Sequence, residues 1–104
     1  MKQYLYVLRL VPRLHNESAW TDADRHTVEA HFQRLQAATD AGTVILAGRT
    51  SEALEASFGL VVFEATGDEE ARKFMDSDPT IVDGVMTATL HPYSVALLRK
   101  THGT

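Results

Sequence analysis

The stretch Tyr4–Val11, with the sequence YLYVLRLV, contains the pattern on which the fold of this chain depends. It is rich in aromatic and branched side chains and stops at Pro12, which is typical of a β-strand with a proline behind it. Successive side chains of a strand point to opposite faces of the sheet. One alternating set consists of Tyr4, Tyr6, Leu8 and Leu10, and the other of Leu5, Val7 and Val11. Both sets are apolar, so the stretch predicts a sheet with two apolar faces.

The segments that follow alternate between helical and extended patterns. They are a helix that begins at a capping-box pattern at Thr21–Asp24 and runs to about Asp40, strands over Thr43–Gly48 and Phe58–Ala65, a helix after Gly67, and a strand from about Val85 to Leu98 that bends near Pro92. The order strand, helix, strand, strand, helix, strand is typical of a ferredoxin-like βαββαβ domain of the α+β class, in which both helices cover one face of an antiparallel sheet.

Two helices leave the second sheet face uncovered. An open apolar face of that size is too large a patch for a soluble monomer. We therefore expect self-association through the open face, and a homodimer is the commonest symmetric solution. Such an interface should bury on the order of 1,000 Å² or more in total.

Length and charge limit the classes of protein to consider. A chain of 104 residues is the size of one domain, so we expect a single domain over residues 1–104 with a flexible tail from about 99 to 104. The formal net charge of -4 disfavours nucleic acid as a partner. The N-terminal residues carry neither a cleavage signature nor an apolar run of membrane-spanning length, which predicts a cytoplasmic protein without a membrane partner.

The available chemistry is restricted by composition. The chain has no cysteine, which removes disulfides, thiolate nucleophiles and the common structural zinc sites. Its five histidines do not show the spacing of metal ligands, and no glycine-rich loop suits a phosphate group. The sequence therefore predicts neither a metal site nor a cofactor, and any catalysis must use histidine, carboxylate or hydroxyl groups.

Two residues are candidates for chemistry. His31, in the stretch VEAHFQRL at residues 28–35, shares a helix face with apolar neighbours. Such a histidine is more often a buried residue bonded to a nearby carbonyl than a catalytic group. Asp78 stands directly before Pro79, where a carboxylate commonly caps a helical turn, so a capping role is at least as good an interpretation as a catalytic one. The residues alone leave both alternatives open.

Several stretches together resemble the YCII-related family, and the resemblance covers nearly the whole chain. They are HFQRL at 31–35, GTVILAGRT at 42–50, FGLVVFEA at 58–65, Asp78-Pro79, GVM at 84–86 and Pro92-Tyr93. The resemblance implies a ferredoxin-like domain that pairs as a dimeric α/β barrel. It also implies that His31 and Asp78 correspond to the His-Asp pair proposed as the active site of the family. Many members have proline after the Ala-Gly pair, whereas Arg49 and Thr50 follow Gly48 here.

The expected function follows from this resemblance. We expect a small cofactor-independent enzyme, a lyase or isomerase that moves a proton on a small anionic or aromatic-derived molecule. His31 would be the general base and Asp78 would orient it, with Arg49 and Thr50 as substrate contacts. An arginine of a solvated loop is an equally good interpretation of Arg49. The alternative is a non-catalytic protein that binds a small ligand or serves as a dimeric interaction module.

Overall fold

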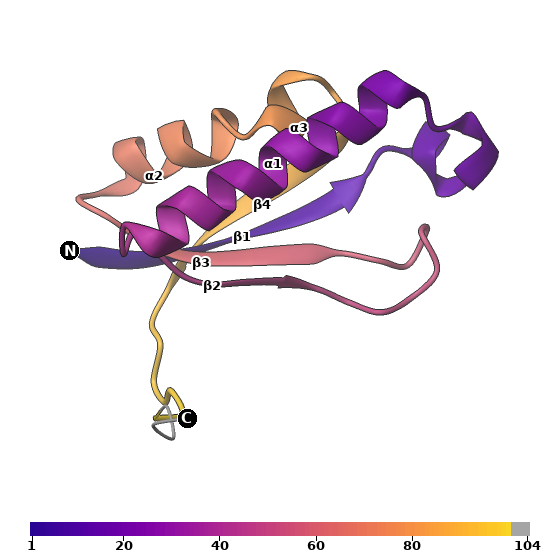
Figure 1. Cartoon of the computed structure of the whole chain (residues 1–104). Helices are drawn as coiled ribbons and strands as arrows, with labels where there is room; N and C mark the ends of the chain where they lie inside the picture. The colour runs from indigo at the N-terminus through magenta and orange to yellow at the C-terminus, as the bar shows by residue number, and fades with distance from the viewer. Residues whose placement is uncertain (101–104) are drawn as a thin grey trace.

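Four antiparallel strands form one sheet in the computed structural model, which describes residues 1–100 (Figure 1). The strands are β1 (Lys2–Leu10), β2 (Val44–Arg49), β3 (Gly59–Ala65) and β4 (Met86–Tyr93). Their order across the sheet is β2-β3-β1-β4, so the first strand of the chain lies between the last two. All three pairings are antiparallel, which confirms the predicted ferredoxin-like arrangement.

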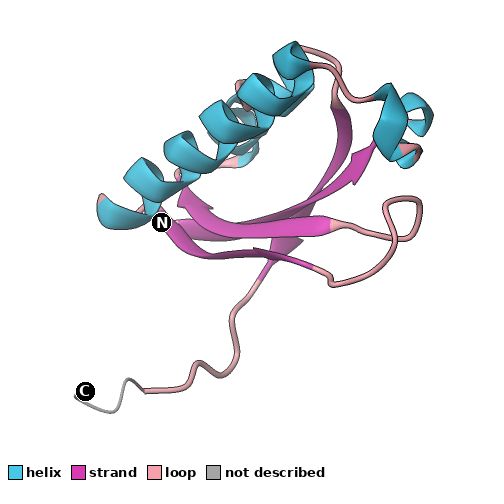
Figure 2. Cartoon of the chain, turned by 45° about the vertical axis from the view of Figure 1, so that its right-hand side comes forward, coloured by secondary structure: helices cyan, strands magenta, loops and turns pink. Residues whose placement is uncertain are grey.

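The helices lie on one side of this sheet, and the other side is bare (Figure 2). They are α1 (Asp22–Asp40), α2 (Asp68–Asp76) and the short α3 (Pro79–Val82). The segment before α1 forms the short 3-10 helices η1 (Pro12–His15) and η2 (Glu17–Ala19). After α1 the chain turns at Gly42, whose φ of 88° lies in the left-handed region that favours glycine.

The core lies between the helices and β1 and β3. Tyr4, Tyr6 and Leu8 are buried on the helix side of β1, whereas Leu5 and Val7 point to the bare side and are half-buried. The helix side of β1 is apolar as predicted, whereas its bare side combines Leu5 and Val7 with the polar Gln3 and Arg9. The buried cluster consists of Tyr4, Tyr6, Leu8, Leu35, Val44, Val61, Phe63, Ala65, Ala71 and Met75.

The last strand is shorter than the sequence predicts. It ends at Tyr93, one residue after Pro92, rather than near Leu98. Tyr93 pairs with Gln3, and only Lys2 of β1 lies beyond that pair, so a longer β4 would have almost no strand to bond. The extended pattern of the sequence therefore continues past the residues at which β4 can pair with β1.

The end of the chain is described only in part. The tail predicted from about residue 99 falls largely on residues 101–104, which lie outside the described residues. Arg99 and Lys100 have no regular secondary structure. Over the described part of the chain, none of the helices is both long enough and apolar enough to cross a membrane.

Candidate active site

The start of α1 is fixed by a reciprocal set of hydrogen bonds. Thr21 Oγ1 accepts a bond from the Asp24 amide at 3.1 Å, and Asp24 Oδ2 accepts one from the Thr21 amide at 2.9 Å. Arg13 of η1 donates two further bonds of 2.9 Å to the same carboxylate. These hydrogen bonds hold the pKa of Asp24 well below its usual range, and the bonds from Arg13 have the largest effect. The helix that carries His31 therefore begins at a defined residue and is fixed to η1.

The short helix α3 holds the second candidate residue. Pro79 occupies its first turn, and Asp78 caps it, with Oδ1 accepting a bond of 3.0 Å from the Thr80 amide. Thr27 of α1 donates a bond of 2.7 Å to Asp83 at the other end of α3. This bond ties the two helices together, so α3 presents the Asp78 carboxylate to α1.

His31 and Asp78 meet directly. The His31 Nδ1 atom lies 2.7 Å from Asp78 Oδ1 and 2.9 Å from Oδ2, although 47 residues separate the two in sequence. The side chain of His31 is 14% exposed and that of Asp78 is 0% exposed. A bond from Nδ1–H to a buried carboxylate selects the tautomer in which Nε2 carries the free lone pair.

The Asp78 carboxylate is also surrounded by Tyr6, Thr80 and Arg34, of which the first two donate hydrogen bonds to it. Tyr6 donates a bond of 2.8 Å to Oδ2, and the Thr80 hydroxyl donates one of 2.7 Å to Oδ1. Burial would raise the pKa of Asp78, but the hydrogen bonds from His31, Thr80 and Tyr6 and the charge of His31 outweigh it and lower the pKa to about 2. Burial and the nearby Asp78 charge raise the pKa of Tyr6 far above its ordinary value, so its phenol stays a donor.

Arg34 completes this buried group one helical turn after His31. Its guanidinium lies over the Phe74 ring, 4.3 Å from the centroid, and Nη2 donates a bond of 2.7 Å to the Phe74 carbonyl. Nη1 is 3.8 Å from Asp78 Oδ2 and has no hydrogen-bond partner within residues 1–100. Arg34 thus places a positive charge beside the carboxylate without competing with His31 for its oxygens.

A cleft of about 600 Å³ lies between α1 and the sheet, and His31 is part of its wall. Its other walls are largely apolar. They come from α1 (Val28, Phe32, Leu35), from the sheet (Leu8, Leu10, Val61, Met86), and from Trp20 and the segment that includes Arg49, Leu54 and Phe58. Asp78 is not among the lining residues, so a ligand in the cleft meets His31 while Asp78 stays behind it.

A family model described as the YCII-related domain matches residues 6–90. This chain belongs to the YCII-related family. No curated protein sequence gives a significant match to it.

Among solved structures, the YCII-related chain is similar to 5-chloro-2-hydroxyhydroquinone dehydrochlorinase from Burkholderia phenoliruptrix AC1100, in a complex with 2,5-dihydroxybenzoquinone. The two chains are 12% identical and superpose with a TM-score of 0.59, which covers 88% of this chain and 93% of the other. At this identity the likeness establishes a shared fold.

The remaining predicted site residues of this YCII-related domain divide into one at the cleft and one away from it. Arg49 lines the cleft and is an exposed residue at the end of β2. Thr50 is not a lining residue. Its amide donates to the Phe58 carbonyl at 2.9 Å, and its hydroxyl accepts from the Phe58 amide at 3.1 Å. Thr50 therefore closes the loop that connects β2 to β3.

Sequence reasoning missed the residues around Asp78. The strand pattern places Tyr6 only on an apolar face, although a buried phenol usually needs a hydrogen-bond partner, and that requirement was the available signal. The helix-capping pattern at Asp78-Pro79 was the available signal for Thr80, because a capping carboxylate accepts a bond from the amide two residues later. Arg34 has no comparable signal, because its position one turn after His31 also suits an exposed helix residue.

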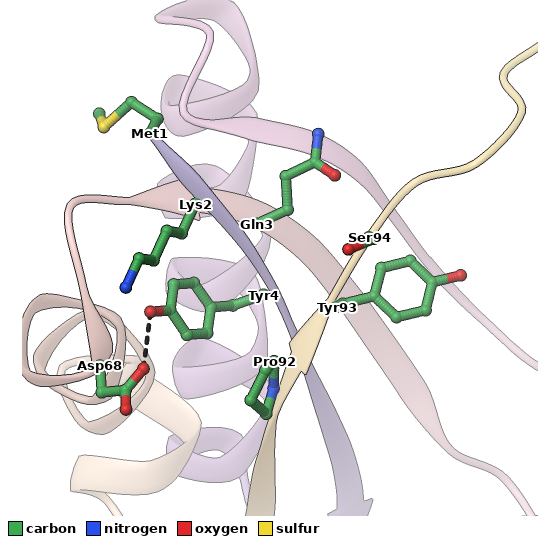
Figure 3. A pocket seen from close by; sticks show the side chains of 8 residues that line it. All are labelled: Met1, Lys2, Gln3, Tyr4, Asp68, Pro92, Tyr93 and Ser94. Carbon is green, nitrogen blue, oxygen red and sulfur yellow. Dashed lines mark hydrogen bonds between the residues drawn. The ribbon is translucent and has the colours of Figure 1, made fainter.

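A second hollow of about 530 Å³ lies at the opposite end of β1 (Figure 3). It is lined by Met1, Lys2, Gln3, Tyr4, Asp68, Pro92, Tyr93 and Ser94. The Tyr4 hydroxyl donates a bond of 2.7 Å to Asp68 in its wall. Across residues 1–100, no three His, Asp or Glu side chains come together as metal ligands.

Proposed function

We propose that this protein catalyses proton transfer on a small anionic or aromatic-derived molecule, as a cofactor-independent lyase or isomerase. The observation that carries the proposal is the position of His31. Its Nδ1 atom is bonded to a buried carboxylate, and its ring borders a cleft. This is the arrangement that a general base requires.

The chemistry follows from the tautomer of His31. With Nδ1–H bonded to Asp78, the Nε2 lone pair takes a proton from a carbon next to a carbonyl group, and the C–H electron pair becomes the double bond of an enolate. The Asp78 carboxylate stabilises the imidazolium that forms. Return of the proton to another carbon gives isomerisation, and loss of a leaving group from the enolate gives elimination.

The walls of the cleft favour a substrate with a planar apolar body and a negative charge. Trp20, Phe32 and Phe58 supply aromatic surface, and the exposed Arg49 supplies a guanidinium that suits a carboxylate or enolate oxygen. The structural neighbour, an enzyme named for its action on a chlorinated hydroquinone, was solved with a quinone ligand. That ligand class agrees with the proposal. Thr50 directly follows Arg49, and its bonds to Phe58 hold the end of β2 at which Arg49 lies, so Thr50 contributes to binding indirectly.

The alternative is a non-catalytic protein that binds a ligand in the same cleft. The capping role of Asp78 supports this alternative, because the residue would cap α3 whether or not the protein is an enzyme. The two proposals share the ligand and differ in what His31 does to it.

A hydrogen exchange experiment separates the two functions without knowledge of the natural substrate. Phenylpyruvate in D2O is a suitable probe, because it carries an aromatic ring, a carboxylate and acidic C3 protons. NMR measures both its binding to the cleft and the loss of its C3 proton signal above the uncatalysed rate. We expect the wild-type protein to accelerate the exchange and His31→Gln to be slower by about 100-fold or more.

The controls rest on two features of α1. The amide side chain introduced by His31→Gln can still donate to Asp78, so this variant should fold and bind phenylpyruvate. His26→Gln changes an exposed histidine of the same helix and should exchange like the wild type. Binding of the probe with no exchange by the wild type would favour the ligand-binding alternative, and equal exchange by His31→Gln would exclude His31 as the base.

We also propose that the protein is a homodimer that pairs through the bare face of the sheet. Leu5 and Val7 of β1 point to that face, and the pairing register places Leu60 and Val62 of β3 beside them. Leu46 of β2 extends the apolar surface and is exposed. These residues form an apolar centre, and polar side chains such as Gln3, Arg9 and Thr89 lie on the same face around it. An apolar centre with a polar rim is typical of a protein interface, and a second copy of the chain would cover it.

A further inference from the structure

The segment Ser94–Lys100, here called the C-terminal arm, leaves the sheet at the end of β4. In both views it extends to the side of the sheet that the helices do not cover (Figures 1 and 2). One hydrogen bond fixes its beginning, because the Val95 amide donates to Gln3 Oε1 of β1 at 2.8 Å. The arm therefore starts at a defined point on the rim of the bare face.

Two leucines follow this fixed point and have no cover. Leu97 is 93% exposed and Leu98 is 67% exposed. A pair of large apolar side chains with so much of their surface in water is unfavourable. Because Val95 is tied to β1 and the arm then extends away, these leucines do not pack on their own sheet.

The length of the arm matches the spacing of two stacked sheets. An extended chain spans about 3.3–3.6 Å for each residue, so Leu97 can reach roughly 10 Å from Ser94 and the end of the arm roughly 20 Å. Sheets that pack face to face lie about 10 Å apart. The leucines are thus the right distance along the arm to reach a second sheet packed on the bare face.

We infer that the C-terminal arm of each subunit crosses the interface and packs Leu97 and Leu98 on the sheet of the partner subunit. This inference rests on the homodimer proposed above and adds a swapped contact to it. Arg99 and Lys100 follow the leucines, and they bring two cations to a partner whose chain has a net charge of -4. The arm and the bare face are then two parts of one interface.

The first test measures the dimer with the arm altered. Leu97→Ser combined with Leu98→Ser should weaken dimerisation by about tenfold or more in sedimentation experiments, because the two leucines of each arm lose their contact with the partner. Val82→Ser is the matched control, since Val82 is 68% exposed but lies on α3, on the helix side. Unchanged dimerisation of the double variant would overturn the inference.

The second test asks whether the contact is between subunits. The chain has no cysteine, so Lys100→Cys provides a single site for a nitroxide spin label and leaves both leucines intact. The labelled protein without isotopes is refolded together with 15N-labelled wild type. We expect the label to broaden amide signals of sheet residues in the 15N-labelled subunits. A dimer with no such broadening would overturn the contact of the arm with the partner subunit but not the dimer. A chain that stays monomeric would overturn the proposed dimer as well.

Discussion

At the scale of single residues, Asp78 has two tasks that depend on the same carboxylate. It caps α3 through the Thr80 amide, and it fixes the His31 ring through Nδ1. Hydrogen bonds from Tyr6 and the Thr80 hydroxyl bring the carboxylate to a full set of donors, as expected for a charge with no exposed surface. Loss of any one donor should therefore change both the stability of the fold and the position of the base.

Tyr6→Phe tests this link. The variant keeps the ring that packs edge-on against Phe63, with 5.6 Å between the ring centroids. It removes only the hydroxyl that donates to Asp78. We expect a loss of about 1–2 kcal/mol in the free energy of unfolding, measured by urea denaturation, because one acceptor site of a buried carboxylate is left empty. The exchange rate of phenylpyruvate should also fall while its binding does not change.

Tyr93→Phe provides the control for Tyr6→Phe. It removes the hydroxyl of an exposed tyrosine on β4 and should alter neither quantity. A Tyr6→Phe variant with wild-type stability would contradict the role assigned to this hydroxyl.

The low pKa of Asp78 predicts how stability depends on pH. The folded state lowers this pKa from 3.8 to about 2, so the charged form is favoured by folding. The corresponding stabilisation is fully present above about pH 4 and is lost as the pH falls to about 2, and its size is on the order of 2 kcal/mol. Asp78→Asn should be less stable at neutral pH and should lack this part of the acid dependence.

Urea denaturation at a series of pH values between neutrality and about pH 2 measures this effect. Asp76→Asn, which changes an exposed carboxylate at the end of α2, should keep the acid dependence of the wild type. If Asp78→Asn also kept it, the carboxylate would not be the group that titrates.

At the scale of secondary structure elements, local signals predicted what depends on local bonds. The capping box at Thr21 and the glycine after Ala41 marked the ends of α1 because both act within a few residues. The end of β4 could not be found in this way, since it depends on where β1 begins. Arg49 lies at the end of β2 and lines the cleft, but its pairing with Gly59, like the bonds of Thr50 to Phe58, depends on the return of the chain along β3.

The bonds of the candidate site were even harder to predict from local sequence signals. Tyr6 and Asp78 are separated by 72 residues, and their bond exists only because the sheet and α3 pack together. Sequence patterns indicated His31 and Asp78 separately, and only the resemblance to a family paired them. The position of Arg34 beside Asp78 likewise follows from the packing of α1 on Phe74, which no local pattern encodes.

At the scale of the whole molecule, the bare sheet face determines the proposed assembly. Val7 lies near the middle of that face, between Leu60 of β3 and Thr89 of β4. Val7→Lys should convert the proposed dimer into a folded monomer, because a buried, unpaired ammonium group is strongly unfavourable in an interface. Sedimentation at micromolar concentration measures the assembly, and circular dichroism checks the fold.

Val82→Lys, on the helix side, is the control and should remain dimeric. A wild-type monomer at micromolar concentration, or a dimeric Val7→Lys variant, would exclude pairing through this face.

The central place of β1 in the sheet also has a consequence during synthesis of the chain. β1 is made first, but its two neighbours, β3 and β4, are made last. At a translation rate of about 5–20 residues per second, roughly 3–10 s pass between the completion of β1 and the appearance of β3. Throughout this interval the nascent chain holds an apolar strand with neither of its partners. We therefore expect the newly made protein to depend on ribosome-associated chaperones far more than its small size suggests.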